Sequence, residues 1–364
     1  MRIVFTGGHH TSALPVLKIL ADHTDIQVVW YGHKHSLKHD KNTTLEYIDI
    51  TSLGIPFFEL KAGKFYKTYD PIRLAKIPYG FFQALYLLIK HKPDLIMSFG
   101  GYLALPVVLA GYILGIPSIT HEQTVVSGFA NKLIARFAKR ILITWPSSAK
   151  YFPKDKTVLT GIPIRSEIFK VTSSNFAVNK DLPTLYITGG KTGSHKINTV
   201  FGDLMGDLLD KVNIIHQCGD YSQTGDFEKL TEQYNRIKHT HSGLYILRKF
   251  VLQDEIGEAF GKADIVVARA GAHIVYDLAA LNKPCILIPI PWVSHNEQYK
   301  NALVLKEAGI AEILSEDKLT HKTLQACIED MLSNLVNYRS AHAQTLVKSN
   351  ADKAIVDEIF KFKV

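Results

Sequence analysis

The chain has 364 residues, of which 46% are hydrophobic and 21% charged. This composition excludes a disordered or fibrous protein, and the length suits two domains of ordinary size. The net charge is +8, and the whole excess lies in residues 1–160, which carry +9 against −1 for residues 161–364. The basic N-terminal half therefore either favours a polyanionic or membrane-surface partner or serves solubility alone.

Cysteine usage and hydropathy exclude several further classes of protein. The three cysteines are far apart and form no CxxC pair, so the sequence predicts neither a disulfide framework nor a zinc knuckle. The apolar run after Arg2 is too short for a signal peptide. An uncharged stretch over residues 95–120 is interrupted by glycines and prolines, which indicates a buried strand–helix–strand segment rather than a membrane span. We therefore expect a cytoplasmic protein.

Short apolar runs alternate with helical patterns along almost the whole chain. Strands are predicted at Arg2–Thr6, Ile26–Tyr31, Asp94–Ser98, Pro117–His121, Arg140–Thr144, Thr184–Thr188, Asn213–Gln217, Leu244–Leu247, Asp264–Ala268 and Pro284–Pro289. Nearly continuous apolar strands separated by longer helices indicate parallel sheets that are covered on both faces. The sequence thus predicts an α/β protein with two Rossmann-like, doubly wound domains.

The alternation pauses in a segment rich in proline, serine and lysine and then restarts with a strand and a glycine turn. We expect a linker near residues 162–180, a first domain over 1–162 and a second over 163–344. A final helix over about 337–362 is long enough for residues 345–364 to pack back on the first domain. In open parallel sheets, ligands bind at the carboxyl ends of the strands, so two facing domains would form a cleft there.

Four predicted strands end in a glycine turn: "VFTGGHHTSA", "MSFGGYLALP", "YITGGKTGSHKIN" and "VARAGAHIVYD". Glycine lets the backbone approach a ligand closely, and exposed N–H groups at a helix start attract anions. Any one of these turns is as readily explained by steric demands alone. None fits the GxGxxG pattern, and GxxxxGK[ST] is absent, which disfavours dinucleotide-binding and P-loop proteins.

A set of motifs in fixed order gives the chain a family resemblance. "TGGHHTSAL", "PDLIMSFGGYLALP", "GIPSITHEQTVVSGFANKLIARFAKRILIT", "TGIPIR", "ITGGKTGSHKIN", "IIHQCG", "ADIVVARAGAHIVYDLAALNKPCILIPIP" and "HNEQYKNALVLKEAGIAEIL" follow one another from the first residues to about Leu314. Together they resemble the MurG family of UDP-N-acetylglucosamine transferases. The resemblance implies a GT-B fold, with a membrane-facing acceptor domain followed by a donor domain.

The implied reaction is an inverting, metal-independent transfer. N-acetylglucosamine would move from UDP-GlcNAc to the 4-hydroxyl of a muramoyl peptide linked to undecaprenyl diphosphate. The resemblance implies no cofactor and no nucleic-acid partner, with UDP-GlcNAc as a substrate. It also implies a peripheral location on an anionic surface at the inner face of the cell membrane.

The resemblance assigns donor binding to Arg165, Gly189, Gly190, Lys191, Thr192, Gly193, Phe250, Val251, Gly271, Ala272, Asp277, Glu297 and Gln298. Arg165 and the turn 189–193 would contact the diphosphate, and main-chain groups at 250–251 the uracil. Asp277 stands where the family has a glutamate that binds both ribose hydroxyls. Gln298 would read the sugar hydroxyls, with Glu297 in place of a second glutamine.

Acceptor binding falls on Thr6, Gly7, Gly8, Gly100, Gly101, Tyr102, His121, Glu122, Gln123 and Thr124. The sequence departs from the family at two points in this set. Thr124 replaces an asparagine that follows the HEQ motif, and Val4 and Phe5 stand where the family has two further glycines.

Inverting transfer needs a base that takes the proton of the acceptor hydroxyl, and histidine suits this role near neutral pH. His9, which completes TGGH, is the candidate base or acceptor-orienting residue, and His10 is its rival. No HxxxH or HExxH spacing joins these histidines to others, and there is no Asp-x-Asp motif, so we expect no metal site.

Besides the positive charge of the N-terminal half, the segment 61–92 also favours contact with a membrane. Its basic residues are Lys61, Lys64, Lys67, Arg73, Lys76, Lys90 and Lys92, and they flank the aromatic-rich run from Phe81 to Ile89. Such segments rest on anionic lipid. We expect the helix over 81–89 to lie in the core and the basic loop before it to contact the membrane.

Three other functions remain open on the sequence. One is a GT-B transferase that acts on another polyprenyl-diphosphate acceptor. Another is a UDP-N-acetylglucosamine 2-epimerase, for which the HEQ and ExQxxNA blocks look wrong. The third is a UDP-sugar-binding subunit without activity, which the presence of both half-sites argues against.

Overall fold

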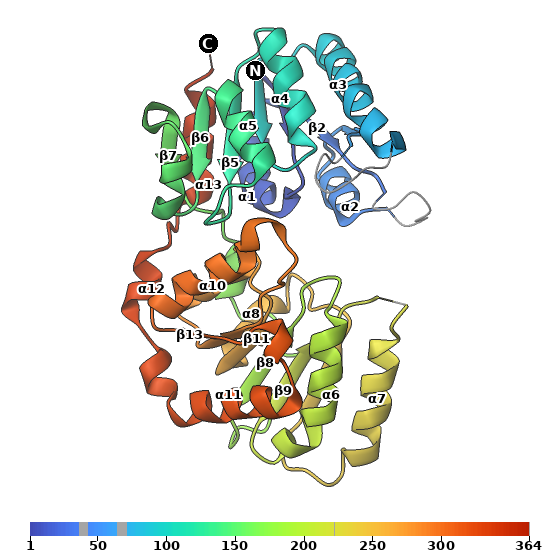
Figure 1. Cartoon of the computed structure of the whole chain (residues 1–364), viewed down its shortest axis with the longest axis vertical. Coiled ribbons are helices and arrows are strands. Elements are labelled where there is room, and N and C mark those ends of the chain that lie inside the picture. Colours follow the sequence, from blue (N-terminus) through green and yellow to red (C-terminus); the bar gives the residue numbers. More distant parts are fainter. Residues whose placement is uncertain (36–42, 64–70, 222, 364) are drawn as a thin grey trace. The chain divides into compact units, whose positions relative to one another are not determined.

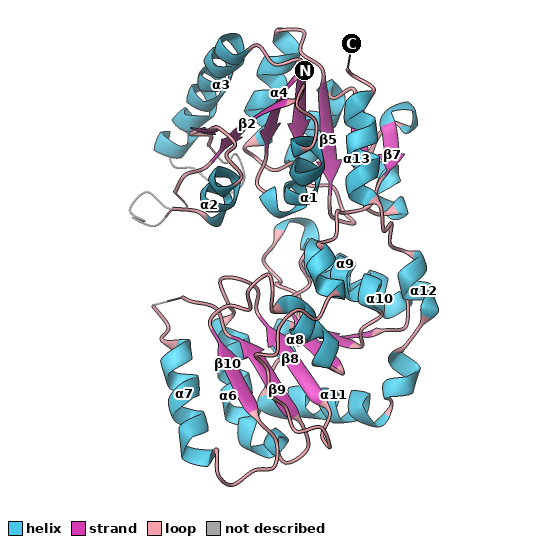
Figure 2. Ribbon diagram, turned by 180° about the vertical axis from the view of Figure 1, so that it is seen from behind, coloured by secondary structure: helices cyan, strands magenta, loops and turns pink. Residues whose placement is uncertain are grey.

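The computed structural model describes residues 1–35, 43–63, 71–221 and 223–363. The chain divides into two compact units, one formed by Met1–Ile164 together with Lys348–Val364 and the other by Arg165–Val347. Each is a parallel sheet covered by helices on both faces (Figures 1 and 2). The predicted α/β class with two Rossmann-like, doubly wound domains is confirmed.

The sheet of the first unit has the strand order β3-β2-β1-β4-β5-β6-β7. Its strands are β1 (Arg2–Thr6), β2 (Gln27–Gly32), β3 (Phe57–Glu59), β4 (Leu95–Ser98), β5 (Ser118–Glu122), β6 (Arg140–Ile143) and β7 (Thr157–Leu159). Its helices are α1 (His10–Ala21), α2 (Leu45–Ser52), α3 (Pro71–His91), α4 (Ala104–Ile113), α5 (Phe129–Phe137) and α13 (Ala351–Phe360), with 3₁₀ helices η1 (Pro146–Tyr151) and η2 (Lys154–Lys156). The chain first runs outward from β1 and then returns to β4, so the strand order reverses between these two strands.

Alternate residues of β1 feed two hydrophobic cores, as the period of two in a strand requires. Ile3 and Phe5 pack with α1 and α13, whereas Val4 packs with α3, α4 and α5 on the opposite face. The terminal helix α13 belongs to the first core because Ile355 and Ile359 lie fully buried against α1. Figure 1 shows this helix, in red, beside the strands of the unit in which the chain begins.

The second sheet has the order β10-β9-β8-β11-β12-β13 and reverses between β8 and β11. Its strands are β8 (Thr184–Thr188), β9 (Asn213–Gln217), β10 (Tyr245–Arg248), β11 (Ile265–Ala268), β12 (Cys285–Leu287) and β13 (Ala311–Ile313). Its helices are α6 (His195–Leu209), α7 (Asp226–Ile237), α8 (Ile256–Lys262), α9 (Ala272–Leu281), α10 (Glu297–Glu307), α11 (His321–Ser333) and α12 (Ala341–Thr345), with 3₁₀ helices η3 (Ser166–Phe169), η4 (Ser294–Asn296), η5 (Glu316–Lys318) and η6 (Leu335–Tyr338).

The single helix predicted over about 337–362 is wrong. The structure has η6, α12 and α13 there, with a non-helical stretch between Leu346 and Asn350. The centre of the predicted helix consists of the polar residues Lys348, Ser349 and Asn350. A helix there would have no apolar face to bury, so packing does not stabilise it.

The helix over 81–89 was predicted to lie in the core, but one face of α3 is exposed. Leu87 and Leu88 are buried in the core as expected, but Phe82, Tyr86 and Ile89 are each more than half exposed. Because these three recur at i, i+4 and i+7, they form one outward stripe of the helix. The basic loop predicted to contact the membrane lies partly in residues 64–70, outside the described residues. No helix in the described part of the chain is both long and apolar enough to cross a bilayer.

Candidate active site

The turns after β1 and β4 meet where the first sheet reverses its strand order. Gly8 donates its N–H to the carbonyl of Gly100 at 3.2 Å, and Phe99 donates to the carbonyl of Thr6 at 2.8 Å. Gly7 has a φ of +130°, and a Cβ there would lie 2.9 Å from the Gly100 oxygen. Only glycine fits this close approach, so the paired glycines bring the two predicted acceptor-side turns together.

The ring of His9 lies at this junction, directly before α1. Its Nδ1 is 3.2 Å from the carbonyl oxygen of Phe99. A carbonyl can only accept, so the neutral ring carries its proton on Nδ1 and presents an unprotonated Nε2. Desolvation lowers the pKa of His9, while the Phe99 contact and the charge of Glu122 oppose the shift. The side chain reaches solvent, which limits the size of the shift. At neutral pH His9 is therefore a base with an available nitrogen.

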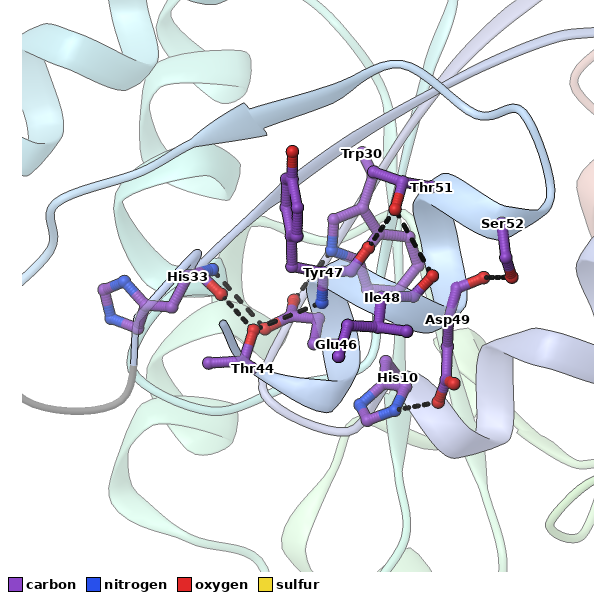
Figure 3. A network of polar contacts seen from close by, with 10 residues as sticks. All are labelled: His10, Trp30, His33, Thr44, Glu46, Tyr47, Ile48, Asp49, Thr51 and Ser52. Atoms are coloured by element: carbon purple, nitrogen blue, oxygen red, sulfur yellow. Dashed lines mark hydrogen bonds and ion pairs between the residues drawn. The ribbon is translucent and has the colours of Figure 1, made fainter. Parts of the chain in front are cut away.

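The partner of His10 lies outside this junction. Its Nε2 is 2.9 Å from Oδ2 of Asp49 on α2. Figure 3 shows the pair within a network that also includes Glu46, Trp30, His33 and Thr44. The two adjacent histidines, which the sequence could not separate, thus have different partners.

His121 and Glu122 end β5 and Gln123 follows directly, and all three side chains of this HEQ motif are buried. His121 donates from Nε2 to the carbonyl of Gly161 at 2.8 Å, and burial lowers its pKa to about 4, so the ring is neutral at pH 7. Thr6 Oγ1, His121 Nδ1 and both amide atoms of Gln123 have no hydrogen-bond partner among the described residues. Buried polar groups without partners are costly, so these atoms are candidates for contact with a ligand.

Glu122 uses both carboxylate oxygens inside the protein. Oε1 accepts from the backbone and hydroxyl of Thr124 at 3.1 and 3.0 Å, and Oε2 accepts from Asn131 at 2.9 Å. Asn131 in turn accepts from the N–H of Gly101 at 3.2 Å. Glu122 therefore fixes the second glycine turn from within. Sequence reasoning did not single out Asn131, although it lies in a quoted motif.

Tyr102 follows the second glycine turn, and its hydroxyl forms a hydrogen bond with a residue outside that turn. Its hydroxyl is 2.7 Å from Nε2 of His33, the residue directly after β2. Burial and the charge of Glu46 raise the pKa of Tyr102, so the phenol stays protonated at neutral pH. The predicted acceptor residues thus surround one point of the first sheet.

In the second unit, the turn 189–193 after β8 leads into α6. Gly193 donates to Gly190 at 3.0 Å, and a side chain at Gly193 would clash with the carbonyl of Cys218. Lys191 and Thr192 are exposed at the tip of the turn. Ser194 caps α6, and Arg269 donates to its hydroxyl at 2.7 Å. The turn is therefore fixed at the helix start, where N–H groups and the helix dipole favour an anion.

Gln217 joins this turn to the predicted uracil segment. Its Nε2 donates to the carbonyl of Gly190 at 3.0 Å, and its Oε1 accepts from the N–H of Val251 at 3.1 Å. Phe250 beside it is exposed. Gln217 was not among the predicted site residues, because its partners are distant in sequence and no local pattern marks it.

Asp277 is a buried residue of α9, which begins after Gly271 with Ala272 as its first residue, and Arg165 lies beside it. Arg165 Nη2 is 3.6 Å from Asp277 Oδ2. Burial raises the pKa of Asp277 to about 6 in spite of the arginine charge. The two residues that the sequence assigned to the phosphates and the ribose are therefore paired with each other in this structure.

Gln298 lies in the first turn of α10, and Glu297 begins that helix. Oε1 of Gln298 accepts from Ala270 at 3.3 Å and from Ile290 at 3.1 Å, which joins the turns after β11 and β12. Asn301 donates to the carbonyl of Ala270 at 3.2 Å and so orders the same turn. The preceding residues His295 and Asn296 both have positive φ, a conformation that costs energy in non-glycine residues. Among the described residues, no group of three or more histidines, cysteines or acids could hold a metal ion.

Comparison with known proteins identifies the class. The glycosyltransferase family 28 N-terminal domain matches residues 4–143, and the glycosyltransferase family 28 C-terminal domain matches residues 184–359. The chain belongs to glycosyltransferase family 28.

Full-length relatives then define its place within that family. A Bacillus cereus protein named UDP-N-acetylglucosamine–N-acetylmuramyl-(pentapeptide) pyrophosphoryl-undecaprenol N-acetylglucosamine transferase 2 is 30% identical over 97% of both chains. The crystal structure of MurG from Acinetobacter baumannii is similar with a TM-score of 0.75, at 26% identity over 99% of both chains. The chain is a divergent MurG homologue, which confirms the predicted resemblance. A UDP-GlcNAc 2-epimerase from Neisseria meningitidis has a TM-score of 0.65 over 99% of this chain and 100% of its own, but at 13% identity it shares the fold alone.

Proposed function

We propose that this protein transfers N-acetylglucosamine from UDP-GlcNAc to the 4-hydroxyl of a muramoyl peptide carried on undecaprenyl diphosphate. The reaction is the one named for its full-length relatives in peptidoglycan synthesis. The observation that carries the proposal is the extent of the match, which includes both units and therefore both half-sites. A chain that bound only one of the two substrates would need only one of these half-sites.

The donor half-site lies at the strand reversal of the second sheet. The turn 189–193, with the Lys191 ammonium at its tip, receives the diphosphate, and Arg165 leaves Asp277 to reach the same phosphates. Asp277 then accepts hydrogen bonds from the ribose hydroxyls. Because Val251 already donates its N–H to Gln217, a main-chain carbonyl at 250–251 accepts from the uracil ring.

The sugar of the donor is read at the start of α10 and beside α9. Oε1 of Gln298 is occupied by two backbone N–H groups, so Nε2 is the atom that donates to a sugar hydroxyl. Glu297 accepts from hydroxyls, and the turn through Gly271 and Ala272 lets the donor approach the backbone. Glutamine can both donate and accept hydrogen bonds, whereas Glu297 can only accept them. A difference in sugar preference between this protein and its family would therefore arise at Glu297.

The acceptor half-site lies at the strand reversal of the first sheet. One side of it is the glycine junction with its flanking residues, namely Thr6, Gly7, Gly8, Gly100, Gly101 and Tyr102. The other side consists of His121, Glu122, Gln123 and Thr124. Gly8, Gly100 and Gly101 already donate their N–H groups inside the protein, so at these positions the glycines would instead let the acceptor diphosphate approach the backbone closely. The unpartnered atoms of Thr6, His121 and Gln123 would bind the muramoyl sugar or its peptide.

His9 acts as the general base of the transfer. Nε2 takes the proton of the 4-hydroxyl as its oxygen attacks the anomeric carbon, while the bond between that carbon and the UDP oxygen breaks. The leaving diphosphate carries the released negative charge, which Arg165, Lys191 and the start of α6 stabilise. Attack opposite the leaving group inverts the anomeric centre.

Contact with an anionic membrane fits the outward face of α3 and the positive first half of the chain. Phe82, Tyr86 and Ile89 offer an apolar stripe, and Lys90 and Lys92 follow it directly. Aromatic and basic residues in this arrangement bind peripherally to lipid surfaces.

The proposal is tested by incubating the protein with labelled UDP-GlcNAc and muramoyl-pentapeptide-diphospho-undecaprenol. We expect a labelled disaccharide lipid and one UDP for each sugar transferred. Intact binding of UDP-GlcNAc without transfer would contradict the proposal. Release of UDP and N-acetylmannosamine without an acceptor would instead indicate a 2-epimerase.

A transferase with another polyprenyl-diphosphate acceptor remains the second candidate because of Thr124. Its hydroxyl lies 2.7 Å from the carbonyl of Val126 and 3.0 Å from Glu122, so the side chain is engaged inside the protein where the family has an asparagine. Transfer to a polyprenyl-diphosphate sugar other than muramoyl peptide would support this candidate.

A further inference from the structure

The start of α1 has no side-chain cap. His9 is the N-cap residue, but its side chain makes no capping hydrogen bond, and the first turn contains no acidic residue. The first N–H groups of a helix have no partner within the helix, and an uncapped start is weakly fixed. The loop before α1 is tied to the second glycine turn through Gly8, and the start of the helix itself is anchored by a residue of another element.

Asp49 provides that anchor from α2. Its carboxylate is 2.9 Å from Nε2 of His10, the first residue of α1. The side chains are only 32% and 15% exposed, so solvent screens their interaction less than that of a surface pair. A negative charge beside the first turn of α1 also complements the helix dipole.

The helix that carries Asp49 is itself fixed to the sheet. Three residues before Asp49, on the same side of α2, Glu46 accepts from the indole N–H of the buried Trp30 at 2.7 Å. Thr44 caps α2 by accepting from the N–H of Tyr47 at 3.1 Å, and it donates to the carbonyl of His33 at 2.6 Å. As Figure 3 shows, these contacts lead from β2 through α2 to His10.

We propose that Asp49 is a positioning residue for the transfer and that, through His10, it fixes the start of α1 and so holds His9 against the glycine junction. The proposal rests on the proposed function, in which His9 takes the acceptor proton. His9 is then held from two sides: Phe99 orients its ring at 3.2 Å, and the His10–Asp49 pair fixes the adjoining backbone. Small displacements of a reacting group lower rates strongly, so this anchor affects the transfer step.

The role assigned to His10 here differs from that of a base. With Nε2 bonded to a carboxylate, His10 serves as a hydrogen-bond donor. The amide nitrogen of glutamine occupies the place of Nε2 and can donate to the same oxygen, but it cannot take up a proton. His10→Gln therefore preserves the anchor and removes any base.

The experiment measures kcat, the acceptor KM and UDP affinity at pH 7.5 for the full chain and its variants. Asp49→Ala and His10→Ala should each lower kcat about 10-fold, and the double variant should show no further loss because both break one interaction. Asp49→Asn, which keeps an acceptor oxygen, and His10→Gln should stay within about 3-fold of the unmodified protein. UDP affinity should not change in any variant.

Asp25→Ala is the matched control. It removes another ion pair of the same unit, with Lys363 at 2.6 Å, beside the amino end of β2. Its kcat should equal that of the unmodified protein. Amide hydrogen exchange over residues 7–12 gives a second readout, which should rise in Asp49→Ala and stay unchanged in Asp25→Ala and Asp49→Asn.

Two results would overturn the proposal. One is an unchanged kcat in Asp49→Ala, and the other is a loss in His10→Gln as large as in His10→Ala, which would make His10 the base. If the unmodified protein transfers sugar to no acceptor, the proposed function fails instead. Exchange over residues 7–12 still decides the anchor in that case, because it requires no turnover.

Discussion

Arg165 lies beside the buried carboxylate of Asp277, with 3.6 Å between Nη2 and Oδ2. Both residues belong to the second unit, and both were assigned to parts of the donor that carry hydroxyls or negative charge. In this structure they satisfy each other. If both residues bind the donor as proposed, UDP would replace this ion pair with two contacts of its own. The protonation of Asp277 can then be studied in the protein without donor.

Asp277→Asn should stabilise the free protein at neutral pH. The pKa of Asp277 is raised from 3.8 to about 6, so the folded protein holds this proton more tightly than the unfolded chain does. The stability that this group contributes is present below pH 3.8 and is lost as pH rises through 6. Urea unfolding at pH 7.5 should show a gain on the order of 1–3 kcal/mol.

The gain should shrink at pH 4.5, where the folded wild-type carboxyl is already protonated. Asp203→Asn, at an exposed position on α6, is the control and should leave the free energy of unfolding unchanged at both pH values. A destabilised Asp277→Asn at pH 7.5 would show that the Arg165 pair outweighs the cost of burial.

The affinity for UDP-GlcNAc should fall as pH decreases through about 6. The ionised Asp277 can accept hydrogen bonds from both ribose hydroxyls, whereas the protonated carboxyl loses acceptor capacity. Calorimetric titration of UDP-GlcNAc at several pH values from 5 to 8 checks this, because its diphosphate has no terminal phosphate that titrates in this range. In Asp277→Asn the affinity should be weaker at pH 7.5 and the decrease near pH 6 should be absent. A decrease that persists in this variant would assign the titration to another group.

His9→Ala should abolish turnover and leave UDP affinity nearly unchanged, because His9 belongs to the unit that does not hold the donor turn. In the unmodified protein, kcat should fall in acid with a midpoint below 6.5, since desolvation lowers the pKa of His9. A steady-state pH profile with a saturating donor measures this midpoint. Retained turnover in His9→Ala, or an acid midpoint well above 6.5, would remove His9 from the role of base.

Gln217→Glu should weaken UDP binding by about 10-fold or more, because a carboxylate cannot donate to the carbonyl of Gly190 and leaves a buried group unpaired. The turn 189–193, proposed for the diphosphate, and the segment 250–251, proposed for the uracil, would then lose their connection. Isothermal titration with UDP tests the prediction. Gln325→Glu, on the remote helix α11, is the matched control and should bind UDP like the unmodified protein.

A triple substitution of Phe82, Tyr86 and Ile89 by serine should reduce binding to vesicles that contain anionic phosphatidylglycerol. The three side chains form the exposed stripe of α3, so their loss removes apolar contact with lipid and leaves the core residues Leu87 and Leu88 in place. Co-sedimentation at low and high salt separates apolar from electrostatic binding. Tyr221→Ser, at an exposed tyrosine of the second unit, is the control. Unchanged sedimentation of the triple variant would move the membrane contact elsewhere.

The sequence predicted the central strands well because their signal is strong and local. β1 and β8 begin and end at the predicted residues, since both are continuous apolar runs followed by glycine. The strands β3, β7 and β13 were missed. Each has three residues, most of them only partly buried, so neither length nor hydropathy distinguishes it from a loop.

The sequence predicted the parts of the site that are formed by glycine turns. It did not predict the contacts between side chains that come from distant segments. At Gly7 and Gly100 the residue type alone predicts that the backbone passes close to another segment or to a ligand. His10 and Asp49, 39 positions apart, and Gln217 and Val251, 34 apart, carry no mutual pattern in one sequence. The same holds for Arg165 and Asp277, whose pairing depends on the packing of α9 beside the first residue of the second unit.

The stereochemistry and linkage of the product test the central claim most directly. After incubation with UDP-GlcNAc and muramoyl-pentapeptide-diphospho-undecaprenol, nuclear magnetic resonance of the released disaccharide reports both. Inverting transfer by His9 predicts a β-linked N-acetylglucosamine on the 4-oxygen of the muramoyl sugar. An α-linkage, or attachment at another oxygen, would contradict the account.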